Sequence, residues 1–141
     1  MKIFIAGIMQ GSKKGHGIQS QDYRQRIRAA VKIQHPEVEC VDPFSRHPDS
    51  VTYDADRARQ VLFEMAAAAG SADIVIAYLP SASMGTALEM IRAYDNGKTI
   101  ISISPMAQNW LVRAVSAIIF PTLDEFCTWV GQADLTELAS A

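Results

Sequence analysis

The sequence has few of the features that belong to a disulfide framework, a metal centre or a membrane protein. Its two cysteines, Cys40 and Cys127, stand far apart, with no CxxC pair and no histidine at a metal-ligand spacing. We therefore expect a reduced, cytoplasmic protein without a metal or other cofactor. No apolar stretch is long enough to span a bilayer, and the opening residues become polar too soon for a signal peptide.

A marked excess of charge of either sign is also missing, since the formal net charge is −2. A dedicated nucleic-acid binder would normally carry a basic face, so we expect neither a nucleic-acid polymer nor a membrane as a partner. Apolar residues, in contrast, make up 49% of the 141 positions, which is too many for a disordered chain and enough for a sizeable core. These numbers predict one globular domain over residues 1–141.

Strand-like and helix-like segments alternate along the chain. Short, continuously apolar runs predict strands, and longer periodic segments between them predict helices. The expected strands are 2–6, 38–41, 74–79, 99–103 and 117–120, and the expected helices are 21–34, 54–69, 86–96, 110–116 and 123–130. Residues 44–53 are expected to form a polar loop, and the tail after Gly131 to fray. This alternation predicts a doubly wound α/β domain with a five-stranded parallel sheet and helices on both faces.

The segment Gly85-Thr86-Ala87-Leu88-Glu89, after the third expected strand, is the most informative part of the sequence. It predicts a helix that begins near Thr86, with Glu89 in its first turn, at the carboxyl end of a central strand. Ligands bind at that edge of open α/β sheets, and the amides at a helix start favour anions. Glu89 is therefore a candidate nucleophile, although a glutamate in a first turn can also serve to stabilise its helix.

Right-handed crossovers place the loops after the first, third and fourth strands at the same edge of the sheet. These loops cover residues 7–14, 80–89 and 104–110. The first loop is rich in glycine and lysine but fits neither the GxGxxG pattern nor the P-loop pattern, so on its own it indicates no particular ligand.

Three blocks of the sequence resemble the nucleoside 2-deoxyribosyltransferase family, whose members act on N-glycosidic bonds. They are the opening strand with its glycine turn, the block Ala72-Asp73-Ile74-Val75-Ile76-Ala77, and the Gly85–Glu89 segment followed by Gly97-Lys98-Thr99-Ile100. The blocks occur in the family's order and span most of the chain. The resemblance implies a flavodoxin-like fold, and it implies that Glu89 attacks the anomeric carbon to give a glycosyl-enzyme.

The residue six positions before that glutamate separates two branches of the family. Nucleoside transferases usually have an aspartate there, whereas the 5′-monophosphate N-glycosidases have a serine that binds the phosphate. This chain has Ser83, so the resemblance implies a nucleotide substrate, because serine donates a hydrogen bond without repelling the phosphate. The first loop resembles the same branch. The residues expected to bind the substrate are Gly7, Met9, Gly11, Ser12, Ser83, Gly85 and Asn109.

Two positions depart from the family pattern. Phe4 stands where the first strand commonly carries a tyrosine near the nucleophile, and Met65 stands where a helix carries the acid that protonates the leaving base. A small insertion over 66–70 would bring Glu64 into register as the general acid/base partner, but Glu64 can equally be an exposed helix residue. The expected function is cleavage of a (deoxy)nucleoside 5′-monophosphate. The alternatives are base exchange between nucleosides and nucleotide binding without turnover.

The loop after the fourth strand adds an expectation about assembly. The resemblance implies that residues near Asn109 and Trp110 reach into the site of a neighbouring subunit, so we expect a homodimer or a dimer of dimers. Trp110 can instead be a buried anchor of its own domain. Tyr78 and Met84 are candidate walls of a base pocket or simply core residues, and the three histidines receive no role.

Overall fold

The computed structural model describes residues 1–9 and 20–140. In these residues five parallel strands form a sheet in the order β2-β1-β3-β4-β5, and the strands are β1 (Lys2–Gly7), β2 (Glu39–Val41), β3 (Ile74–Tyr78), β4 (Thr99–Ile103) and β5 (Ile118–Phe120). The helices are α1 (Asp22–Gln34), α2 (Pro43–Arg46), the 3-10 turn η1 (Ser50–Thr52), α3 (Ala55–Ser71), α4 (Met84–Asp95), α5 (Trp110–Val115), α6 (Leu123–Val130) and α7 (Leu135–Ser140). The predicted five-stranded, flavodoxin-like α/β fold is confirmed. None of the described helices is both long and apolar enough to cross a membrane.

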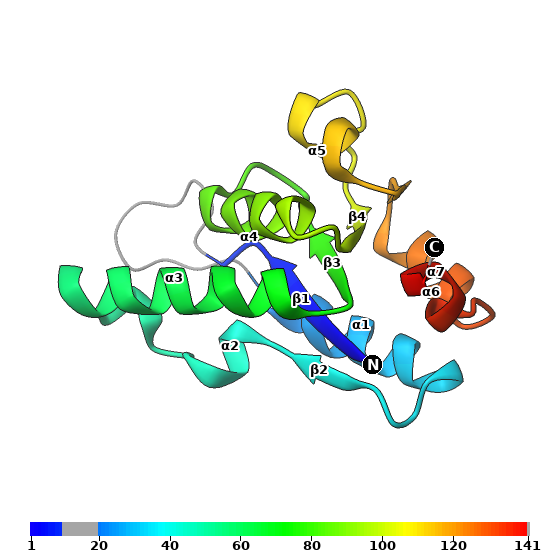
Figure 1. Ribbon diagram of the computed structural model, residues 1–141, viewed down its shortest axis with the longest axis horizontal. Coiled ribbons are helices and arrows are strands. Elements are labelled where there is room, and N and C mark those ends of the chain that lie inside the picture. The colour runs from blue at the N-terminus through cyan, green and yellow to red at the C-terminus, as the bar shows by residue number, and fades with distance from the viewer. Residues whose placement is uncertain (10–19, 141) are drawn as a thin grey trace.

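The strands are apolar without interruption because both faces of the sheet are covered. Successive residues of a strand point to opposite faces, so Ile3 and Ile5 of β1 join one buried cluster while Phe4 and Ala6 join the other. Residues of α1, α6 and α7 complete the first cluster, and residues of α3, α4 and α5 complete the second. Figure 1 shows α3 and α4 side by side across the front of the sheet, with α1 behind it.

Two expected boundaries are wrong in ways that affect the site. Helix α4 begins at Met84, two residues before the expected start, because Ser83 caps it. The expected polar loop over 44–53 contains α2 and η1 instead. Asp42 starts α2 by accepting a hydrogen bond from the backbone N–H of Phe44 at 3.0 Å, and Pro43 follows at the first helical position, where its fixed backbone angle suits a helix.

The expectation that the tail frays is also wrong. The tail forms α7, whose Leu135 is fully buried in the cluster on the α1 side of the sheet. The backbone N–H of Leu135 donates to Nε2 of His35 at 3.1 Å, and the side-chain amide of Gln34 donates to the carbonyl of Gly131 at 2.8 Å. These partners stand about a hundred residues earlier in the chain, so a local sequence pattern does not reveal them.

Candidate active site

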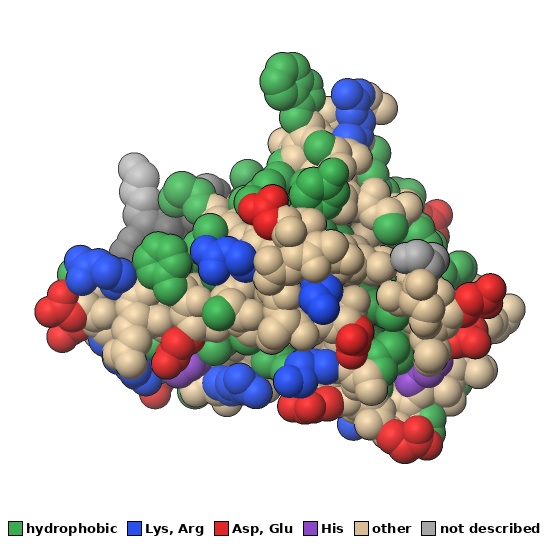
Figure 2. Space-filling model, in the orientation of Figure 1, with side chains coloured by type: hydrophobic (Ala, Val, Ile, Leu, Met, Phe, Trp, Pro, Cys, Tyr) green, Lys and Arg blue, Asp and Glu red, His purple; other side chains and the backbone are tan. Residues whose placement is uncertain are grey.

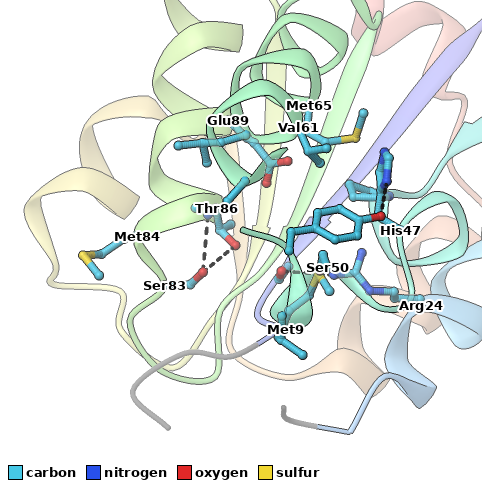
Figure 3. Close-up of a pocket in the computed structure, with 17 residues that line it drawn as sticks. Met9, Arg24, His47, Ser50, Val61, Met65, Ser83, Met84, Thr86 and Glu89 are labelled. Carbon is cyan, nitrogen blue, oxygen red and sulfur yellow. Dashed lines mark hydrogen bonds between the residues drawn. The ribbon is translucent and has the colours of Figure 1, made fainter. Parts of the chain in front are cut away.

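A cavity of about 330 Å³ opens at the carboxyl edge of the sheet (Figure 3). Its walls come from the end of β1, the segment after β2, the loop after β3, and residues of α3 and α4. This volume lies at the lower end of the range for small-molecule sites. The expectation that the loop after β4 joins this site is not met by that loop's described residues, because the cavity extends towards β2 and away from β4.

Glu89 lies in the second turn of α4, because that helix begins at Met84, so the expected position in the first turn is wrong. Its carboxyl group points into the cavity beside Val61 and Met65 (Figure 3), and only 8% of the residue is exposed. Burial raises the pKa of Glu89 to about 8, and the positive charge of Arg24 limits the rise. These buried surroundings favour the protonated acid, and a cationic centre bound beside Glu89 would favour the carboxylate.

The start of α4 presents small polar groups to the same cavity. The Ser83 hydroxyl accepts a hydrogen bond from the backbone N–H of Thr86 at 3.3 Å and pairs with the Thr86 hydroxyl at 2.9 Å. Ser83, Gly85 and Thr86 all line the cavity. A Cβ on Gly85 would meet no described atom within 4 Å, so the described residues leave space beside the first turn. An anion bound here would face the positive end of the helix dipole.

Gly7 ends β1 at the cavity and leaves no room for a side chain. A Cβ at this position would lie 2.6 and 2.7 Å from two ring carbons of Tyr23. The Tyr23 hydroxyl donates to the carbonyl of Ile8 at 2.9 Å, so the ring is fixed and does not yield easily. Glycine is therefore required here by the close approach of a buried ring and not by an unusual backbone angle.

The remaining residues expected to bind the first loop's ligand or the base differ in whether they line the cavity. Met9 lines the cavity, whereas Gly11 and Ser12 lie outside the described residues. Met84 stands at the cavity rim and is 91% exposed. Tyr78 is not in the cavity wall, because its ring stacks on Tyr23, with 4.3 Å between ring centroids, in the cluster on the α1 side.

Arg24 is a cavity residue that the sequence reasoning missed. It is 2% exposed and donates to the carbonyls of Ile5 and Gly7, both at 3.1 Å, and to the carboxylate of Asp42 at 3.0 Å. These bonds fasten the ends of β1 and β2 to α1 beside the cavity. The sequence does indicate that Arg24 is buried, because it precedes Ile27 by three positions and so lies on the apolar face of its helix.

The segment after β2 supplies further cavity residues that were missed, among them His47, Ser50 and Tyr53. Nδ1 of His47 and the hydroxyl of Tyr53 are hydrogen-bonded at 3.0 Å, and the two rings meet edge to face. The guanidinium of Arg57 lies over the Tyr53 ring, 5.3 Å from its centroid. The signal for this segment is its place after β2, because the carboxyl ends of neighbouring parallel strands share one edge of the sheet.

Three residues singled out in the sequence lie away from the cavity. Glu64 is exposed on α3 and outside the described cavity lining, where its neighbour Met65 stands instead. The side-chain oxygen of Asn109 caps α5 by accepting hydrogen bonds from two backbone N–H groups of its first turn, at 3.0 and 3.3 Å. Trp110 is 83% exposed, so the alternative that it is a buried anchor within the chain is wrong.

No protein-family model and no curated protein matches the sequence. Solved structures do match the fold. A 2-deoxyribosyltransferase from the psychrotolerant bacterium Bacillus psychrosaccharolyticus aligns with a TM-score of 0.68 at 17% identity, over 98% of this chain and 96% of its own. A conserved protein from Enterococcus faecalis V583 aligns with a TM-score of 0.61 at 15% identity, over 93% of this chain and 97% of its own. A CMP N-glycosidase from Clostridium botulinum aligns with a TM-score of 0.53 at 19% identity, over 94% of this chain and 100% of its own. The chain therefore shares the fold of these proteins, in agreement with the family resemblance of its sequence.

Proposed function

We propose that the protein is an enzyme that cleaves the N-glycosidic bond of a (deoxy)nucleoside 5′-monophosphate, with Glu89 as the nucleophile. The observation that carries the proposal is the buried Glu89 carboxyl, which enters an open cavity at the carboxyl edge of the sheet. The fold shared with a 2-deoxyribosyltransferase and a CMP N-glycosidase supports the same class of reaction.

The proposed step uses the apolar surroundings of Glu89. An oxygen of its carboxylate bonds to C1′ as the C1′–N bond breaks, and the electron pair of that bond leaves with the base. The transition state resembles an oxocarbenium ion, whose positive charge favours the ionised carboxylate in a wall of low polarity. Water then releases the sugar phosphate from the glycosyl ester, and a second base in place of water would give transfer.

A panel of ribonucleotides, deoxyribonucleotides and the matching nucleosides tests this function. Free base, detected by liquid chromatography without an added acceptor, would identify a hydrolase. A new nucleoside or nucleotide, formed when a second base is added, would identify a transferase. Tight binding without base release from any member of the panel would contradict the proposal and favour a nucleotide-binding protein without turnover.

Ser83 and the start of α4 are the proposed 5′-phosphate site, and an aspartate at position 83 tests it. Aspartate also caps helices well, so Ser83→Asp keeps the start of α4 but adds a negative charge that repels phosphate. A charge-assisted hydrogen bond contributes about 1.5–3 kcal/mol, so we expect nucleotide affinity to fall roughly 10- to 150-fold. Affinity for the matching nucleoside, measured by calorimetry in parallel, is expected to change little.

Ser83→Asn is the matched control, because asparagine has the size and capping ability of aspartate without its charge. It is expected to keep the preference for the nucleotide. Equal affinity of the unmodified protein for a nucleotide and its nucleoside would remove the proposed phosphate site.

We also propose a homodimer, or a dimer of dimers, in which α5 of one subunit covers the cavity of another. Helix α5 projects from the body of the molecule (Figures 1 and 2), and its first residue, Trp110, is exposed. Met84, on the cavity rim, is also exposed. Exposed apolar surface often marks a contact site, and two-fold symmetry lets one such surface complete two cavities.

Subunit mixing tests this arrangement. Asn109→Asp keeps the cap of α5 but replaces the side-chain N–H donors with a negatively charged carboxylate, while Glu89→Gln removes the nucleophile. Each variant alone is expected to be inactive. When the two are co-expressed in equal amounts, half of the dimers are hybrids with one intact site, so about a quarter of the original activity should return. A fully active monomer at assay dilution, or no recovery in the mixture, would exclude the composite site.

A further inference from the structure

The departing base needs a proton, and few groups in the cavity wall can give one. The base leaves with the electron pair of the broken bond, and protonation by a positioned acid speeds such a step. Among the described residues that line the cavity, the titratable ones are Arg24, His47, Tyr53 and Glu89. Glu89 is the proposed nucleophile at C1′, so the other three are the candidate acids among the described lining residues.

Arg24 is unsuited to this role. A guanidinium keeps its protons under all ordinary conditions. Its N–H groups are also already engaged with two β1 carbonyls and with the carboxylate of Asp42. Met65, which lies beside Glu89 in the wall (Figure 3), offers no proton either, because its side chain ends in a thioether. The neighbouring Glu64 is exposed outside the described cavity lining.

The imidazole of His47 is held in place through one ring nitrogen, Nδ1, and its other nitrogen, Nε2, can bind a ligand. Its Nδ1 pairs with the hydroxyl of Tyr53 at 3.0 Å, and the structure gives its Nε2 no hydrogen bond to any of the described residues. Tyr53 is held in turn by the Arg57 guanidinium over its ring. Histidine is the commonest general acid in enzymes, because imidazole exchanges protons near neutral pH.

The placement of His47 also suits the stereochemistry of the proposed step. A nucleophile that attacks C1′ and a base that leaves from C1′ lie on opposite faces of the sugar ring, so the acid and Glu89 must stand on different walls. Glu89 comes from α4, and His47 comes from the segment after β2 (Figure 3).

We propose that His47 is the general acid that protonates the leaving base and that Tyr53 is the residue that positions it, an inference that rests on the proposed function. The bond from Glu89 to C1′ forms, the C1′–N bond breaks, and the base nitrogen takes the proton from Nε2 of the His47 imidazolium, which becomes neutral imidazole. In the second half, the imidazole takes a proton from the attacking water. The water oxygen bonds to C1′, and Glu89 leaves as a carboxylate.

The dependence of the rate on the leaving group tests this assignment. One substrate is the nucleotide that the protein cleaves best, and the other is a p-nitrophenyl riboside 5-phosphate, whose phenolate leaves without a proton. His47→Gln is expected to lower kcat for the nucleotide by about 10²- to 10⁴-fold and kcat for the p-nitrophenyl substrate by less than about tenfold. Tyr53→Phe, which keeps the imidazole but removes its partner, should show a smaller loss with the same selectivity.

His35→Gln is the matched control, since His35 bonds to the segment around α7 and lies outside the described cavity lining. It is expected to affect the two substrates equally. Equal loss on both substrates in His47→Gln, or a nucleotide-specific loss in Glu64→Gln instead, would overturn the assignment to His47 alone. If the unmodified protein releases neither base nor nitrophenol, the proposed function fails, and the assignment fails with it.

Discussion

Replacement of Glu89 by glutamine is expected to abolish base release while the fold survives. Glutamine has nearly the shape of glutamate, so α4 and the cavity should be preserved, but its neutral amide does not form the glycosyl ester that the proposed mechanism needs. Loss of a catalytic nucleophile lowers kcat by at least about 10³-fold in well-studied enzymes. Single-turnover release of base from the best nucleotide, followed by liquid chromatography, measures the effect.

Glu37→Gln makes the same chemical change on an exposed carboxyl outside the described cavity lining and is expected to keep normal turnover. Covalent trapping gives an independent measurement. A 2-deoxy-2-fluoro nucleotide slows breakdown of the glycosyl-enzyme, so mass spectrometry should find the adduct on the peptide that contains Glu89. Near-normal turnover of Glu89→Gln, or an adduct on a different residue, would refute the covalent mechanism.

The same substitution is expected to make the protein more stable at neutral and higher pH. The pKa of Glu89 rises from 4.5 to about 8 on folding, so between these values the unfolded chain binds fewer protons than the folded one. Stability therefore falls as pH rises through this window. One pKa unit corresponds to about 1.4 kcal/mol, so Glu89 should lower the free energy of unfolding by about 3 kcal/mol between about pH 5 and pH 7.5.

Urea unfolding of the two proteins at several pH values isolates this effect. Other groups titrate in both proteins and cancel in the difference, so the advantage of Glu89→Gln should grow steadily with pH and level off above about pH 8. Glu37→Gln, which makes the same change on an exposed carboxyl outside the described cavity lining, is the matched control. A difference that does not change with pH would mean that Glu89 is ionised without cost in the folded protein.

The sequence predicts the elements of the fold correctly where a local pattern of residues determines them. Strands such as β3 are continuously apolar because they are covered on both faces, and this signal is independent of the rest of the chain. Helix α4 begins two residues before the start that the Gly85–Thr86 motif predicts, because Ser83 caps it. Helix α7 was missed because Leu135 and His35 become neighbours only when the chain has folded.

The site was predicted in part for a related reason. The strand-loop-helix segment around Glu89 carries its own signal, so its place beside a cavity could be expected from the sequence. Arg24, His47 and Tyr53 lie on elements whose roles depend on the order of the strands. The segment after β2 reaches the cavity because β2 pairs with β1. The polar sequence of this segment does not indicate which strand β2 pairs with.

The two faces of the sheet differ in a way that bears on practical use of the protein. The cluster completed by α6 and α7 lies on the face opposite to α3 and α4, and no residue of α6 or α7 is among those that line the cavity. A reporter group or solid support attached beyond α7 would therefore leave the cavity entrance clear. Libraries of variants aimed at heat resistance can likewise be directed to α6 and α7, which contribute no residue to the described cavity lining.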